Sequence, residues 1–130
     1  MRLWQRMGGT IAILSGRQSP AVEARAKDLG ISLVMQGIAD KLAACEVLCR
    51  RAGVTDAQTC VMGDDLIDMP PMKRCGFAIA PANALPVVKR VAHYVTRRAG
   101  GEGAVAEAIE RLLRRNGLWS AALRQSGVHG

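Results

Sequence analysis

Aromatic residues make up only 3% of the 130-residue chain, which argues against a protein that stacks single-stranded nucleic acid on aromatic side chains. The four cysteines form no CxxC pair and are too few for a disulfide framework, so reduced thiols and a cytoplasmic location are expected. No apolar run reaches the length of about 20 residues that a membrane span requires. The rest of the composition, 49% apolar and 22% charged, is typical of one globular domain.

The net charge of +7 is concentrated toward the end of the chain. From Lys89 onward there are eight basic and three acidic residues. Such an excess favours anionic partners, including phosphorylated small molecules. No basic motif interleaved with aromatic residues accompanies it, so nucleic-acid binding is not predicted.

Short apolar segments rich in β-branched residues alternate with helical patterns along the whole chain. This alternation predicts a mostly parallel, doubly wound α/β sheet with helices on both faces, in a core spanning residues 1–117 that a C-terminal tail, 118–130, follows. The predicted buried strands are 10–14, 31–35, 59–62, 77–80 and 93–96. The predicted helices are 21–29, one between Asp40 and Gly53, 70–74, 85–91 and 104–116, and the first six residues are expected to end a helix.

A cluster of three carboxylates follows the third predicted strand, in the sequence GDDLID from Gly63 to Asp68. Carboxylates this close together repel one another, and hard oxygen ligands in a tight turn suit Mg²⁺. The alternative interpretation is a helix start that gains from negative charge in its first turn. The third carboxylate and the preceding strand favour the metal.

Two further polar groups follow the first and second predicted strands. Ser15, Gly16 and Arg17 offer a hydroxyl, close backbone N–H groups and a guanidinium, which together can hold a phosphate. Lys41 follows Asp40 and by itself is more typical of a solvated helix start. Because the carboxyl ends of parallel strands meet at one sheet edge, we expect Ser15, Lys41 and Asp64 to converge there.

Four stretches taken in order resemble the haloacid dehalogenase-like phosphatases: Ile11–Ser19, Met35–Lys41, Gly63–Pro70 and Tyr94–Val105. The resemblance implies a capless Rossmann-like core, a Mg²⁺ cofactor and a homotetramer. Within the family it points to hydrolysis of a sugar phosphate monoester in lipopolysaccharide precursor synthesis. It also implies a role for each matching residue. The implied roles are phosphoryl contact by Ser15, charge stabilisation by Lys41, phosphate or substrate binding by Gly16, Arg17 and Arg97, and Mg²⁺ binding by Asp64 with support from Asp65 and Asp68.

The chain departs from the family pattern at two places. Ala106 stands where the family usually carries an arginine, and no DxD sequence, the family's source of a nucleophilic aspartate, occurs in these residues. We therefore expect the matching strand to lie upstream of Met1. The alternatives are a non-catalytic module that binds anions or assembles with a partner, and a phosphatase-like domain of an acylneuraminate cytidylyltransferase.

The family's sheet places the DxD strand between the strands at 10–14 and 59–62. Without it, two arrangements are possible. Either those two strands pair directly, which we expect of a chain that is stable alone, or a space remains between two unpaired edges, which is costly in a dry interior and would leave the chain unstable alone.

Overall fold

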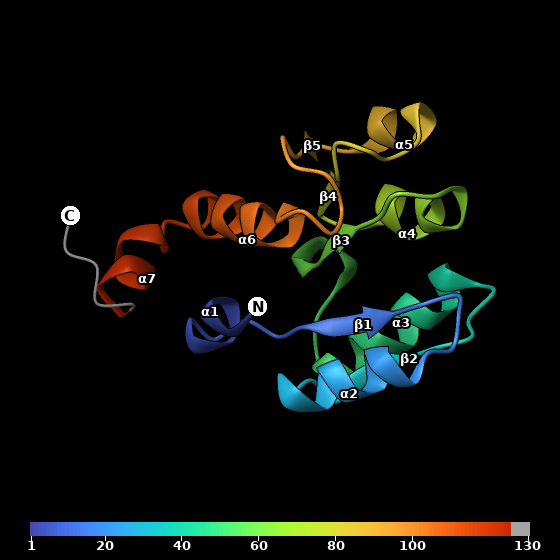
Figure 1. Cartoon of the computed structure of the whole chain (residues 1–130), viewed down its shortest axis with the longest axis horizontal. Coiled ribbons are helices and arrows are strands. Elements are labelled where there is room, and N and C mark those ends of the chain that lie inside the picture. Colours follow the sequence, from blue (N-terminus) through green and yellow to red (C-terminus); the bar gives the residue numbers. More distant parts are fainter. Residues whose placement is uncertain (126–130) are drawn as a thin grey trace.

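The computed structural model of the protein describes residues 1–125, in which strands and helices alternate (Figure 1). The strands are β1 (Ala12–Leu14), β2 (Leu33–Met35), β3 (Cys60–Met62), β4 (Phe77–Ala80) and β5 (Tyr94–Val95). The helices are α1 (Arg2–Arg6), α2 (Pro20–Asp28), α3 (Lys41–Ala52), α4 (Met69–Arg74), α5 (Pro86–Val91), α6 (Ala104–Arg115) and α7 (Trp119–Gln125), with short 3-10 helices η1 (Asp56–Gln58) and η2 (Leu66–Asp68).

The strands form two parallel sheets, one of order β1-β2 and one of order β3-β4-β5. Every strand pair is parallel, as the alternating pattern predicts. Of the two arrangements expected for the strands at 10–14 and 59–62, the structure has the second: β1 pairs with β2 alone and β3 with β4 alone. The polar groups that follow β1 and β3 therefore come from two different sheets.

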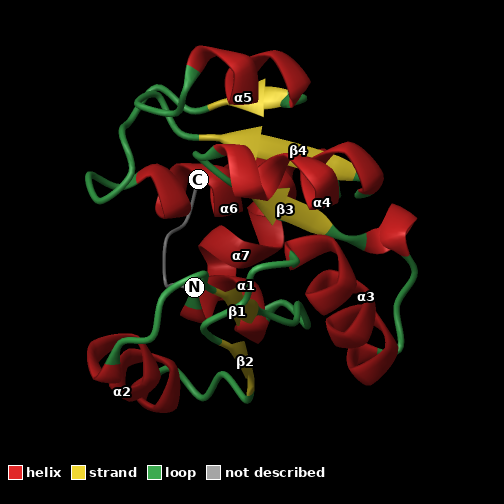
Figure 2. Ribbon diagram, turned by 90° about the vertical axis from the view of Figure 1, so that its right-hand side faces the viewer, coloured by secondary structure: helices red, strands yellow, loops and turns green. Residues whose placement is uncertain are grey.

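Helices cover both faces of the β3-β4-β5 sheet (Figure 2). All four residues of β4 are buried. On one face Ala78 and Ala80 pack with Met72 of α4 and Val88 of α5. On the other face Phe77 and Ile79 pack with Ala108 of α6. Met72, Ala78, Ala80 and Val88 are fully buried, so this face forms a central part of the core.

The β1-β2 sheet is much less buried, which corrects the prediction of a buried strand at 10–14. Ala12 is exposed, whereas Ile13 and Leu14 are half-buried. None of the three residues of β2 is buried either. The physical reason is that β1 has a hydrogen-bonded neighbour on one side only. The observed strand is also shorter than predicted, because backbone pairing begins only at Ala12.

Two layers of helices connect the sheets. On one face α3 contacts both β1 and α4. Elsewhere α1 packs against α6 and α7, where Leu3 and Trp4 join a cluster built on Ile109, Leu113 and Ala122. The β1-β2 and β3-β4-β5 sheets, the two half-sheets of the domain, are thus joined through helices rather than through strand pairing.

The helix ends follow the predicted capping chemistry at α3. The Asp40 carboxylate accepts a hydrogen bond from the backbone N–H of Ala43 at 3.0 Å, and Gly53 ends the helix with a φ of 72°. The first six residues contain the expected helix, α1.

Helix α7 was not predicted, because its pattern WSAALRQ lacks an N-terminal capping residue. It occupies part of the segment expected to be a tail, and the remainder, residues 126–130, lies outside the described residues. Within residues 1–125, no helix has both the length and the apolar character needed to cross a membrane.

Candidate active site

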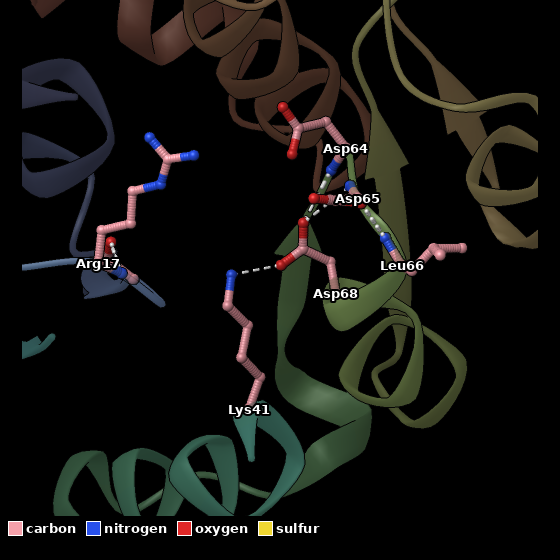
Figure 3. Close-up of polar contacts among 7 residues, drawn as sticks. Arg17, Lys41, Asp64, Asp65, Leu66 and Asp68 are labelled. Atoms are coloured by element: carbon pink, nitrogen blue, oxygen red, sulfur yellow. Dashed lines mark hydrogen bonds and ion pairs between the residues drawn. The ribbon is translucent and has the colours of Figure 1, made fainter. Parts of the chain in front are cut away.

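Lys41 and Asp68 form the polar centre of the candidate site (Figure 3). Lys41 is the first residue of α3, and its Nζ lies 2.5 Å from Oδ1 of Asp68 at the end of η2. The two side chains are 12% and 10% exposed. Because the pair is largely removed from water, each charge depends on the other. The pair also joins an element that follows β2 to one that follows β3.

The second carboxylate oxygen of Asp68 stabilises the acidic turn, residues 63–68, through hydrogen bonds to its backbone. Oδ2 accepts hydrogen bonds from the backbone N–H groups of Asp64 at 3.0 Å and Asp65 at 3.1 Å. Burial raises the pKa of Asp68, but the hydrogen bonds from Lys41 and from the backbone of Asp65 and Asp64 lower it by more. The pKa therefore lies below its ordinary value, and Asp68 stays ionised.

Gly63 allows the turn to fold back onto Asp68. A Cβ atom at position 63 would lie 2.4 Å from Cβ of Asp68 and 2.9 Å from Sδ of Met72. Both neighbours belong to buried residues that have little room to move. A side chain here would push the Asp68 carboxylate away from the backbone groups that it holds.

We therefore expect the Gly63→Ala variant to lose about 1–3 kcal/mol of the free energy of unfolding, the usual cost of overpacking. The measurement is urea denaturation. The matched control is Gly100→Ala, where the nearest atom to a new Cβ is 3.5 Å away, so its loss should stay within about 0.5 kcal/mol. Equal losses in the two variants would contradict the crowding at Gly63.

The turn after β1 lies against the acidic turn after β3. A Cβ atom at Gly16 would be 3.3 Å from Cδ1 of Ile67, a residue of η2. Next to it, Oγ of Ser15 accepts a hydrogen bond from the backbone N–H of Arg17 at 3.2 Å. In Figure 3, Arg17 extends from the β1 side and Asp64 from the β3 side, with Lys41 between them.

Asp64 supplies the carboxylate best suited to a cation. It is exposed, and its side chain makes no hydrogen bond or ion pair within the described residues. Asp68 is committed to Lys41, while Oδ1 of Asp65 accepts the backbone N–H of Leu66 at 2.7 Å. No group of three or more potential ligand side chains occurs in residues 1–125. One free carboxylate fits Mg²⁺, which keeps several of its waters.

Within residues 1–125, Arg97 makes no hydrogen bond or ion pair with these residues. It lines a separate hollow of about 210 Å³ between β5 and α6. Its backbone N–H donates to both carboxylate oxygens of Glu107, at 2.9 and 3.0 Å, and the Tyr94 hydroxyl donates to Glu107 at 2.7 Å. Sequence reasoning missed Glu107, for which the signal in the sequence was an acidic residue in the first turn of a predicted helix.

The site combines an anion-compatible turn, a buried cation and a free carboxylate at the carboxyl ends of parallel strands. Comparison with known proteins places the chain in a class: it matches the haloacid dehalogenase-like hydrolases over residues 30–109. This match covers more than half of the chain, and the protein belongs to that family.

Individual relatives narrow the similarity further. The 3-deoxy-D-manno-octulosonate 8-phosphate phosphatase of Haemophilus influenzae is 41% identical over 107 residues, which cover 82% of this chain and 59% of the relative. The enzyme of that name from Escherichia coli K12 is 40% identical over 116 residues, 89% of this chain and 62% of the relative. The chain therefore spans about three fifths of the length of these curated relatives.

A solved structure carries the same name. It is the Moraxella catarrhalis phosphatase in complex with a magnesium ion, a phosphate ion and a KDO molecule. The TM-score is 0.91 at 35% identity, and the match covers 95% of this chain and 71% of that chain. The likeness includes both half-sheets, since only 5% of this chain lies outside it.

Proposed function

We propose that the protein is the phosphate-binding and metal-binding part of a Mg²⁺-dependent phosphatase acting on 3-deoxy-D-manno-octulosonate 8-phosphate. The observation that carries the proposal is the buried Lys41–Asp68 pair, with the free carboxylate of Asp64 beside it. The Moraxella relative, which binds magnesium, phosphate and KDO, supports this choice of cofactor and substrate.

Each residue of the site makes a different contribution to phosphoryl transfer. Lys41 places a fixed positive charge near the phosphoryl oxygens, and Asp68 holds that ammonium group in position. The Ser15 turn offers a hydroxyl and backbone N–H groups to the same anion. Asp64 would hold Mg²⁺, which when bound neutralises negative charge on the phosphate. These contributions are positioning and charge neutralisation, which dominate this reaction class.

Formation of an aspartyl-phosphate needs a nucleophilic carboxylate that these residues do not provide. Asp64 is proposed as the metal ligand, and the carboxylate of Asp68 is held by Lys41. We therefore propose that the nucleophile belongs to a segment outside the 130 residues. The alternative, a non-catalytic module that binds anions or assembles with a partner, rests on the same observation.

The metal assignment can be tested by calorimetry on the 130-residue chain. We expect Mg²⁺ to bind with a dissociation constant on the order of millimolar, since one charged ligand contributes. The Asp64→Ala variant should bind at least about 10-fold more weakly. The control is Asp28→Asn, an exposed aspartate at the end of α2, which should bind as the unchanged chain does. Equal affinity in all three proteins would contradict the role of Asp64.

The substrate assignment needs a chimera. The residues that precede the matched region of the Haemophilus relative are joined to Met1, and phosphate release is measured. We expect release from 3-deoxy-D-manno-octulosonate 8-phosphate that depends on Mg²⁺ and stops on chelation. Hydrolysis of other sugar phosphates alone would overturn the specificity. A folded chimera that binds phosphate without hydrolysing any ester would favour the non-catalytic alternative.

We also propose a homotetramer and a cytoplasmic location, on the family resemblance. Sedimentation equilibrium of the chimera tests the assembly, and cell fractionation tests the location. A monomer at micromolar concentration, or recovery with the membranes, would contradict them.

A further inference from the structure

The hollow between β5 and α6 has the features of a second binding site. It measures about 210 Å³ and is lined by Tyr94, Arg97, Glu107, Glu110, Arg111 and Arg114. Figure 1 shows the loop that leads from β5 back to the start of α6 and joins the two elements that line it. The described residues of its lining do not include Lys41 or Asp68, so the hollow is separate from the candidate active site.

Two of the three guanidinium groups in the hollow have no acidic partner. Arg114 pairs with Glu110 at 3.4 Å. The side chains of Arg97 and Arg111, by contrast, make no hydrogen bond or ion pair within residues 1–125. A guanidinium group carries five N–H donors in a fixed plane, and this arrangement matches the oxygens of a phosphate or carboxylate. The donors of Arg97 and Arg111 are therefore available to a ligand.

The aromatic ring of Tyr94 holds Arg111 in place. The guanidinium carbon of Arg111 lies 5.0 Å from the centroid of that ring, within the range of a cation–π interaction. Stacking restricts the long side chain and leaves the N–H groups at the edge of the guanidinium plane free. Less conformational entropy is then lost when an anion binds. Three residues later, Arg114 lies in the same way 4.9 Å from the centroid of the Trp119 ring.

Glu107 is not the partner of either free guanidinium group, since its carboxylate accepts other donors. Its oxygens accept the backbone N–H groups of Arg97 and Arg98 at 2.9–3.0 Å and the Tyr94 hydroxyl at 2.7 Å. Burial raises the pKa of Glu107, but these hydrogen bonds lower it by more, so the carboxylate stays ionised. The lining as a whole, with three arginines and two glutamates, keeps a net charge of +1.

We propose that this hollow binds a small phosphate-type anion through the guanidinium groups of Arg97 and Arg111. The ligand is a free phosphate ion or the phosphate group of a small monoester. A volume of about 210 Å³ is below the roughly 300 Å³ of the smallest sites for drug-sized ligands, so the ligand is small. Two free guanidinium groups match a phosphate dianion better than a monocarboxylate. The proposal does not depend on the phosphatase activity.

Tyr94 is the only tyrosine of the chain, so its ring signals in an NMR spectrum report on this hollow. The test titrates inorganic phosphate into the full 130-residue chain at neutral pH, with chloride added to keep the ionic strength constant. We expect the Tyr94 signals to shift and to saturate with a Kd on the order of millimolar. Arg97→Gln and Arg111→Gln should each raise this Kd at least about 10-fold, because one charge-assisted contact is lost.

Two control variants remove the same charge elsewhere. Arg90→Gln alters an exposed residue of α5, and Arg17→Gln alters the turn after β1. Both should leave the Kd measured at Tyr94 unchanged. Equal weakening in Arg90→Gln would reveal a diffuse effect of net charge and would overturn the proposal. Tyr94 signals that ignore phosphate, or that respond equally to acetate, would also overturn it.

A second titration distinguishes the two sources of the phosphate group. Glycerol phosphate replaces inorganic phosphate under the same conditions. An equal or lower Kd identifies a monoester as the ligand, and a higher Kd identifies the free ion.

The ionisation of the Tyr94 phenol provides an independent readout. The hydrogen bond to Glu107 and burial raise the pKa of Tyr94, whereas the charges of Arg97 and Arg111 lower it by less. A bound phosphate neutralises these two arginines, so saturating phosphate should raise the pKa of Tyr94 further. Ultraviolet absorbance of the phenolate measures it. In Arg97→Gln the pKa should already be higher without phosphate and should respond less to it. The same response in this variant as in the unchanged chain would contradict binding at Arg97.

Discussion

The Lys41→Ala variant is expected to lose about 3–5 kcal/mol of the free energy of unfolding, the cost of leaving one charge of a buried pair without its partner. The ammonium group of Lys41 is the only side-chain donor to Asp68 in residues 1–125, and the Asp68 side chain is 10% exposed. Urea denaturation at neutral pH measures the loss. The matched control is Lys73→Ala on the exposed side of α4, which should change stability by no more than about 0.5 kcal/mol.

Catalysis provides a second readout for Lys41. In the chimera, Lys41→Ala should lower kcat by about two to four decades, because a charge that stabilises the transferring phosphoryl group is removed. Assays are run below the unfolding temperature of the variant, so that lost turnover is separated from lost fold. Normal turnover in a folded variant would remove Lys41 from the mechanism while leaving its structural role intact.

The Asp68→Asn variant should also be strongly destabilised, and its stability should respond less to acid. The pKa of Asp68 is lowered in the folded protein. Its contribution is therefore present above the unfolded pKa of about 3.9 and is lost as pH falls through the lower folded pKa. Unfolding free energies measured between neutral pH and about pH 3 should fall more steeply for the unchanged chain than for Asp68→Asn.

A double replacement separates the pair from its surroundings. Lys41→Met combined with Asp68→Asn removes both charges, so the combined loss should be smaller than the sum of the single losses. Asp28→Asn serves as the exposed control and should leave the pH dependence unchanged. Additive losses for the double variant would contradict a direct interaction between Lys41 and Asp68.

Most of the fold could be predicted from the sequence because its signals are local. Alternating strand and helix patterns predict a parallel sheet, and Asp40 and Gly53 bound their helix as capping chemistry requires. The burial of β1 could not be predicted, since Ile13 and Leu14 are apolar whether or not a neighbour covers them. Helix α7 was missed because its pattern lacks an N-terminal capping residue, and its packing against Ile109 and Leu113 of α6 is a tertiary contact that the local sequence does not show.

The candidate site was predictable to the extent that chain order determines strand ends. The structure brings Lys41 to Asp68, and Gly16 to Ile67, beyond the carboxyl ends of β1, β2 and β3. The different hydrogen-bond partners of the three aspartates could not be predicted from the sequence. The sequence shows three equivalent carboxylates, whereas hydrogen bonding commits Asp68 to Lys41 and leaves Asp64 free. The roles of all the predicted site residues remain predictions: Ser15, Gly16, Arg17, Lys41, Asp64, Asp65, Asp68 and Arg97.

The division of the sheet has a consequence for motion within the molecule. The Ser15 turn follows a strand of the β1-β2 sheet, whereas Asp64 and Asp68 follow a strand of the β3-β4-β5 sheet. Sheets that share no hydrogen-bonded ladder can open and rotate as separate cooperative units. The Lys41–Asp68 pair then acts as a tether across the boundary between these units. An anion held by both Ser15 and Lys41 beside Asp64 would be a second tether, so occupancy of the site and rigidity of the whole molecule would rise together.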